Sequence, residues 1–118
     1  MIVQPWPLIP VPGNPAGNKE RGFDPVRVIC QEISWKTKNP ILAVLWRKPG
    51  KSQKNLGKDE RQSSIKNGIL LRENLTNLPK EVYLVDDIFT TGATADHCSE
   101  LLKARGVKTV FLIGAAGP

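Results

Sequence analysis

The stretch VYLVDDIFTTGAT, residues 82–94, says more about the fold than any other part of the chain. Its first four residues are β-branched, aromatic or leucine, which predicts a buried strand over residues 82–85. Asp86 and Asp87 follow this strand directly, and a turn rich in threonine leads into a helix. Because parallel α/β sheets bind ligands beyond the carboxyl ends of their strands, the stretch predicts a binding site as well as a strand.

The two halves of this stretch suit different groups of one ligand. Amides at a helix start attract a phosphate, threonine hydroxyls add donors, and Gly92 permits a close approach or a positive φ. Asp86 and Asp87 would repel a phosphate, but they suit sugar hydroxyls or a hydrated metal ion. A phosphorylated sugar with free vicinal hydroxyls satisfies both halves. The sequence lacks the GxxxxGK[ST] and GxGxxG patterns of triphosphate and dinucleotide sites.

The rest of the chain alternates between strand and helix patterns. Asp24 and Pro25 predict the start of a helix over residues 25–35, and a second helix after the threonine turn is expected to end before Gly106. The other expected strands cover residues 7–11, 41–46, 68–71 and 109–113, with a turn at 74–79. This alternation predicts an α/β fold with a mostly parallel sheet flanked by helices.

Length and composition fit one soluble domain over residues 1–118, with 40% apolar residues. No apolar run reaches the roughly 18 residues of a membrane span, and the first residues do not resemble a signal peptide, so we expect a cytoplasmic protein. Cys30 and Cys98 fit no metal-ligand spacing and fall on the apolar sides of the expected helices. They are therefore interpreted as buried free thiols.

The net charge of +6 is concentrated in one segment. Residues 47–66 hold seven basic side chains against two acidic ones, a net +5: Arg47, Lys48, Lys51, Lys54, Lys58, Arg61 and Lys66. Residues 47–68 show no apolar period, which is typical of a functional lid or of a flexible loop. A basic run without interleaved aromatic residues lacks a stacking platform for bases, so direct nucleic-acid binding is not expected.

VYLVDDIFTTGAT resembles the signature of type I phosphoribosyltransferases, which bind phosphoribosyl pyrophosphate (PRPP). The resemblance implies a phosphoribosyltransferase-like fold, here with a reduced hood over the acceptor. It implies that Asp86 and Asp87 hold the 2- and 3-hydroxyls of the ribose and serve catalysis. The 5-phosphate would then be held by Thr90, Thr91, Gly92, Ala93 and Thr94.

Nearly the whole chain resembles one branch of that superfamily, the competence protein ComF family. The shared motifs are a PVP stretch at 10–12, RGFD at 21–24, and a basic loop with Gln53, Leu56 and Arg61, in which Asn67 is displaced from the usual pattern. The four-cysteine zinc module of many ComF proteins is absent. The chain is either a zinc-free relative or a fragment with the transferase domain alone.

The resemblance also implies a pyrophosphate site and a role for Mg²⁺. The loop over residues 12–21 would meet the pyrophosphate through Pro12, Gly13 and Arg21, unless it is an ordinary surface connection. The basic lid would add Lys48 and Gln53 to this pyrophosphate site. It would also supply the catalytic residues Lys51 and Arg61, unless the segment is only a solvated loop. Mg²⁺ would bind through substrate and water near Asp86 and Asp87, without a direct protein ligand.

Two functions remain open at this point. One is Mg²⁺-dependent transfer of the phosphoribosyl group to a nucleobase or other nitrogen acceptor, by a protein that could form a homodimer. The alternative is a non-catalytic PRPP-binding regulator or adaptor linked to DNA uptake. Thr90 stands where hypoxanthine-type enzymes have an aspartate, which argues against such a purine acceptor. His97 is expected at the surface, and Trp6, Trp35 and Trp46 are expected to pack at strand and helix ends.

Overall fold

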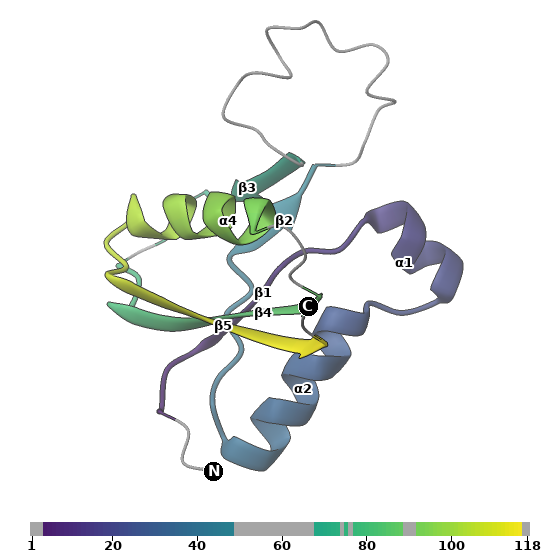
Figure 1. Cartoon of the computed structure of the whole chain (residues 1–118), viewed down its shortest axis with the longest axis horizontal. Coiled ribbons are helices and arrows are strands. Elements are labelled where there is room, and N and C mark those ends of the chain that lie inside the picture. The colour runs from purple at the N-terminus through teal and green to yellow at the C-terminus, as the bar shows by residue number, and fades with distance from the viewer. Residues whose placement is uncertain (1–3, 49–67, 74, 76, 89–91, 117–118) are drawn as a thin grey trace, which may run out of the picture.

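A parallel sheet organises the part of the chain that the computed structural model describes, residues 4–48, 68–73, 75, 77–88 and 92–116. Its strands β1 (Leu8–Pro10), β4 (Glu81–Ile88) and β5 (Thr109–Ala116) lie side by side in the order β1–β4–β5 (Figure 1). The central strand β4 is covered on both faces, which explains its continuous apolar run. The expected strand at 82–85 is therefore confirmed as the middle of the sheet.

Helices cover both faces of this sheet (Figure 1). α2 (Pro25–Thr37) lies on one face and buries Cys30 against β1 and β4. α4 (Ala93–Lys103) lies on the other face and buries Cys98 and Leu102. The expected α/β fold, with a parallel sheet flanked by helices, is confirmed at this level. Both cysteines are free and buried, as expected.

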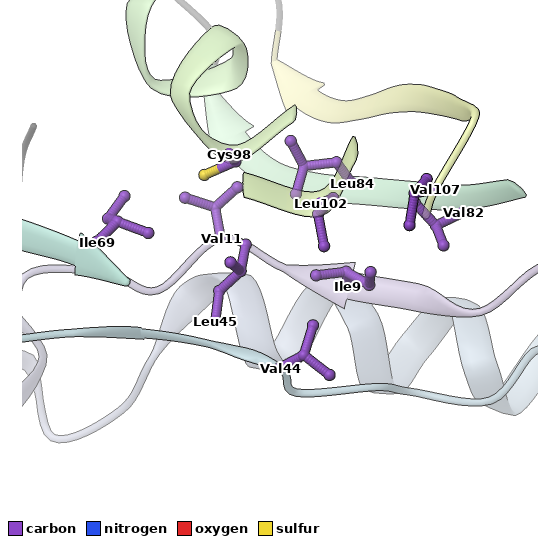
Figure 2. Close-up of a cluster of buried hydrophobic side chains, with 10 residues drawn as sticks. All are labelled: Ile9, Val11, Val44, Leu45, Ile69, Val82, Leu84, Cys98, Leu102 and Val107. Atoms are coloured by element: carbon purple, nitrogen blue, oxygen red, sulfur yellow. The ribbon is translucent and has the colours of Figure 1, made fainter. Parts of the chain in front are cut away.

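The larger core cluster lies on the α4 side of the sheet (Figure 2). The central strand β4 supplies alternate side chains to it, Val82 and Leu84, because successive residues of a strand point to opposite faces. The buried members are Ile9, Val11, Val44, Leu45, Ile69, Val82, Leu84, Cys98, Leu102 and Val107. Ile9, Val82 and Leu84 are completely inaccessible to solvent, so β1 and β4 are held firmly beneath α4.

A short antiparallel pair adjoins the main sheet. β2 (Leu45–Arg47) pairs with β3 (Ile69–Leu71), with Trp46 opposite Leu70. The strand expected over 41–46 is only partly correct, because Ile41 forms a single parallel bridge to Leu8 before the chain turns away. Most of the expected flexible loop at 47–68 lies outside the described residues.

The interpretation of residues 12–21 as a loop is also only partly correct, because α1 (Pro15–Arg21) forms within it. The side chain of Asn14 caps this helix by accepting a hydrogen bond from the amide of Ala16 at 3.0 Å. Pro15 occupies the first helical position, and Gly22 ends the helix in the left-handed region at φ 82°. α1 and α2 then meet at a sharp corner, where Asp24 caps α2 through the amide of Val26.

The expectation that His97 lies at the surface is wrong. Its side chain is only 5% exposed, and its Nε2 lies 3.0 Å from the carbonyl oxygen of Ile69. Because a carbonyl oxygen only accepts, Nε2 is the donor, and the bond ties α4 to β3. A buried polar group needs such a partner, so the ring serves the contact between the two elements.

The three tryptophans have different environments. Trp6 packs against Tyr83 and Phe111, with ring centroids 5.2 and 4.9 Å away, as expected for a residue at a strand end. The packing expected for Trp35 is wrong, because this side chain is 79% exposed at the end of α2, with Lys38 over its ring. Trp46 is partly exposed in β2.

Among the described helices, none is long and apolar enough to cross a membrane.

Candidate functional site

A pocket of about 230 Å³ opens beyond the carboxyl ends of β1 and β4. Its wall is assembled from segments that are far apart in the sequence: the loop after β1, α1, the first turn of α2, the end of β2, and the start of α4. Predicted site residues meet there, namely Pro12, Gly13, Arg21, Asp86, Asp87 and Thr94. The resemblance implied that these residues surround one ligand, and the structure brings them to one cavity.

Asp86 and Asp87 are both held by the backbone of β4. An Oδ1 atom of Asp86 accepts a hydrogen bond from the amide of Asp87, and Oδ1 of Asp87 accepts one from the amide of Ile88, each at 2.8 Å. Asp86 is half-buried, whereas Asp87 is exposed. The pair therefore presents two fixed acceptors to the pocket, in different surroundings.

The buried position of Asp86 changes its acidity. Burial raises the pKa of the Asp86 carboxyl to about 6, and the neighbouring Asp87 side chain contributes to the rise, while the positive charge of Arg47 opposes it. A carboxyl with this pKa is still mostly ionised at neutral pH, so it can accept hydrogen bonds from hydroxyl groups there. It would lose that ability in mildly acidic solution.

The start of α4 lies beside the two aspartates. Gly92 precedes this helix with a φ of 81°, and its carbonyl accepts from the amide of Asp96 at 2.8 Å. The positive φ expected for Gly92 is thus present. Thr94 lines the pocket, whereas Gly92 and Ala93 do not belong to its wall. Thr90 and Thr91, which were predicted to hold a phosphate, lie outside the described residues.

The loop after β1 is shaped by a contact with α1. A Cβ atom built on Gly13 would lie 3.0 Å from Nδ2 of Asn18, so a larger residue there would push against that side chain. Arg21 in turn donates from Nη2 to Oδ1 of Asn18. Asn18 therefore links the loop to the guanidinium of Arg21, and all three residues line the pocket.

Asn14, Asn18, Asp24 and Arg47 also line this pocket, although none of them was predicted to bind a ligand. Asp24 was predicted as a helix cap and as the last residue of the RGFD motif, without a binding role. Arg47 was counted in the basic segment, yet its position at the end of a strand was a signal that it could reach the site. Asn14 and Asn18 were not predicted as binding residues, because no helix was expected over residues 15–21.

The structure describes Lys48 from the residues predicted for the basic lid. Lys48 is exposed and absent from the wall, and its backbone amide donates to the carbonyl of Gly68 at 2.8 Å. Lys51, Gln53 and Arg61 lie outside the described residues. Their predicted roles stay predictions.

The wall combines hydrogen-bond acceptors with cationic donors. Asp86, Asp87 and Asp24 supply carboxylates, while Arg21 and Arg47 supply guanidinium groups. This arrangement can hold a ligand that bears both hydroxyls and anionic groups. In the described part of the chain, no group of three or more His, Cys, Asp or Glu side chains could hold a metal ion by itself. Mg²⁺ needs only one or two carboxylates when a substrate supplies phosphate oxygens, so Asp86 and Asp87 fit that role.

Comparison with known proteins gives two similar competence proteins, and no protein-family model matches the chain. Competence protein F of Haemophilus influenzae is 30% identical over 115 residues, which cover 95% of this chain and 50% of that protein. Competence protein ComFC of Streptococcus pneumoniae is 26% identical over 110 residues, covering 89% of this chain and 45% of that protein. The chain thus spans about half the length of these relatives, and the similarity supports a ComF-like family.

Proposed function

We propose that this chain binds PRPP and transfers its phosphoribosyl group to a nitrogen nucleophile, with release of pyrophosphate. The observation that carries the proposal is the meeting of Asp86, Asp87 and Thr94 with Gly13 and Arg21 around one pocket. Asp86, Asp87 and Thr94 belong to the stretch that resembles the PRPP-binding signature. Gly13 directly follows, and Arg21 begins, a motif that resembles those of the ComF family. The α/β fold with its pocket at the strand ends supports a phosphoribosyltransferase-like architecture with a reduced hood.

In this proposal the ribose and the 5-phosphate take separate parts of the wall. Asp86 and Asp87 accept hydrogen bonds from the 2- and 3-hydroxyls, because their carboxylates are already oriented by backbone amides. The 5-phosphate lies at the start of α4 near Thr94, where the helix presents amides and a positive dipole end. Repulsion between carboxylates and phosphate keeps the sugar in one orientation.

The pyrophosphate group takes the side of the pocket formed by Pro12, Gly13 and Arg21. Arg21 supplies a positive charge there, and its guanidinium is oriented by Asn18. Mg²⁺, held by the pyrophosphate, water and the nearby carboxylates of Asp86 and Asp87, would neutralise charge on the leaving group.

The chemistry requires little covalent help from the protein. The nitrogen lone pair forms a bond to the anomeric carbon, and the bond from this carbon to the pyrophosphate oxygen breaks, with its electron pair leaving on pyrophosphate. The sugar passes through an oxocarbenium-like transition state, as in glycoside hydrolysis. Arg21 stabilises the departing charge, and Asp86 and Asp87 keep the ring in position.

The alternative is a PRPP-binding regulator or adaptor that uses the same pocket without turnover. The names of the two similar proteins favour this alternative, since the names refer to competence and not to a reaction. Both forms of the proposal place the protein in a competence-related process. They differ only in whether pyrophosphate is released.

Isothermal titration calorimetry with PRPP, with and without Mg²⁺, tests the shared part of the proposal. We expect binding that Mg²⁺ strengthens, and a loss of about tenfold or more in affinity for Asp86→Asn and for Asp87→Asn. Glu81→Gln is the matched control, because it removes a carboxylate from the exposed opposite end of the same strand. Absence of binding to the intact chain would overturn both forms.

Pyrophosphate release then separates the enzyme from the regulator. The chain is incubated with PRPP, Mg²⁺ and a panel of nucleobases and other nitrogen compounds, and pyrophosphate is quantified. Release that depends on one acceptor and is lost in Asp87→Asn supports the transferase. Tight binding without release under any acceptor supports the regulator.

A further inference from the structure

Within the described part of the chain, the main sheet has one open edge, which is the outer edge of β5 (Figure 1). β4 occupies the inner edge of β5 in one register from end to end. The opposite edge of the sheet is closed, because the backbone of Leu8 forms hydrogen bonds with Pro40 and Leu42 there. The outward amides and carbonyls of β5 are therefore available to another strand.

The sequence of β5 does nothing to protect this edge. Proteins usually block an exposed edge with charged side chains, proline or a bulge. Residues 109–116, TVFLIGAA, contain no charged residue and no proline, and the constant register with β4 leaves no bulge between the two strands. An uncharged strand of high β propensity promotes aggregation unless a partner covers it.

Two large side chains of β5 are half exposed, on opposite faces of the sheet. Phe111 is 47% exposed on the face that α2 covers, where it lies beside Trp6 and Tyr83. Leu112 is 50% exposed on the face of α4. α2 packs on β1 and β4, so it leaves β5 uncovered on that side. A strand added at the outer edge would cover side chains on both faces, because neighbouring strands pack side chain against side chain.

We propose that β5 pairs with β5 of a second copy of this chain, in antiparallel orientation, so that the two three-stranded sheets join into one sheet. A two-fold axis relates the copies, and it lies at Leu112, which is then opposite Leu112 of the second copy. Phe111 lies opposite Ile113 of the second copy, a pair of aromatic and β-branched side chains that stabilises a sheet. This register covers both exposed side chains. The proposal is independent of PRPP binding.

The charge distribution favours a second copy as the occupant of this edge. The chain carries a net charge of +6, so two copies repel each other wherever their basic residues meet. Along the paired strands no charges meet, because Lys108, directly before β5, lies opposite the uncharged Ala116 of the second copy. Lys108 and Lys108 of the second copy are then separated by the strand length from position 108 to position 116, roughly 26 Å, well beyond the screening length of about 8 Å. A charged partner, in contrast, would find no opposite charge on this strand.

Sedimentation velocity of the intact chain over a wide range of concentration tests the pairing. We expect a monomer–dimer equilibrium with a Kd of roughly 1–100 µM, as is typical of a small interface. Leu112→Lys should weaken dimerisation at least about tenfold, because it places two positive charges opposite each other on the axis. Val28→Lys is the matched control, since Val28 is 45% exposed on α2 and should leave the dimer intact when replaced. A monomer at every concentration, or equal weakening by the two variants, would overturn the proposal.

A disulfide tests the register without adding a charge. Residues directly opposite in an antiparallel pair have Cα atoms about 4.5–5.5 Å apart, which is within reach of a disulfide. Oxidised glutathione should therefore convert Leu112→Cys into a covalent dimer, whereas Val28→Cys should stay monomeric on a non-reducing gel. The native thiols of Cys30 and Cys98 are buried and should not take part. Equal cross-linking of the two variants, or none through Leu112→Cys, would overturn the pairing of β5 with itself.

Discussion

The guanidinium of Arg47 donates from Nε and Nη2 to the carbonyl oxygen of Pro12, at 3.2 and 3.0 Å. These bonds join the end of β2 to the loop after β1, across 35 positions of sequence. Arg47 lines the pocket, and its charge lowers the pKa of Asp86 against the stronger effect of burial. It is a positioning residue for the loop after β1, which also lines the pocket.

Replacing Arg47 should separate its charge from its geometry. Arg47→Met removes both, so we expect the free energy of unfolding to fall by about 1–2 kcal/mol and the pKa of Asp86 to rise further. Arg47→Lys keeps the charge without the planar fork, and should restore most of the Asp86 pKa but less of the stability. Urea unfolding and NMR titration measure the two effects. If Arg47→Lys matched the original protein in both unfolding free energy and the pKa of Asp86, the role of the planar guanidinium would be contradicted.

The raised pKa of Asp86 predicts a pH effect on stability. The native state holds the Asp86 proton up to about pH 6, whereas the unfolded chain releases it near pH 4. Stability therefore falls as pH rises from about 4 to about 6, because the native state binds more protons than the unfolded state there. Since Asp86 is half-buried, we expect only about 1 kcal/mol after screening by solvent.

Asp86→Asn checks the sign of this effect. The variant should be more stable than the original protein at pH 7 and equal to it below about pH 4, as measured by urea unfolding across this range. PRPP binding should show the opposite preference, since ionised Asp86 is the form that accepts from hydroxyls. An Asp86 carboxyl that titrates near pH 4 in NMR would contradict both expectations.

Local sequence patterns predicted some elements and buried residues of this structure but not others. The strand at 82–85 and the buried cysteines could be predicted, because an apolar run and a helical period report burial directly. α1 could not, since a helix of seven residues has too few apolar positions to show a period. The bond from Arg47 to Pro12 could not be predicted, because it depends on how β1 and β2 meet, and no local pattern contains that information.

His97 illustrates the same limit, and its contact can be tested. Because its buried ring donates to the carbonyl of Ile69, His97→Ala should lose about 1–3 kcal/mol of unfolding free energy. His97→Gln, which keeps an amide donor of similar reach, should recover part of the loss. PRPP binding by the folded variants should change little, because His97 does not line the pocket. A stability of His97→Ala equal to that of the original protein would show that the contact is unimportant.

The two cysteines should be unreactive in the native protein. Burial raises the pKa of Cys30 to about 11 and that of Cys98 to about 12, so at pH 8 the reactive thiolate is present in about one molecule in a thousand or fewer. We expect a chromogenic disulfide reagent to label neither thiol quickly under native conditions and both in urea. Rapid labelling of one equivalent without denaturant would contradict the burial of that thiol.

Gly92 and Gly106 offer a matched pair at the two ends of α4. Both have positive φ, 81° and 101°, and a Cβ at either position would meet no atom within 4 Å. Gly92→Ala and Gly106→Ala should therefore each cost about 1 kcal/mol of stability through backbone strain alone. Only Gly92→Ala should also weaken PRPP binding, because a strained turn displaces the amides at the start of α4. Urea unfolding and calorimetry distinguish the two effects, and equal PRPP affinities for both variants would argue against a phosphate at this helix start.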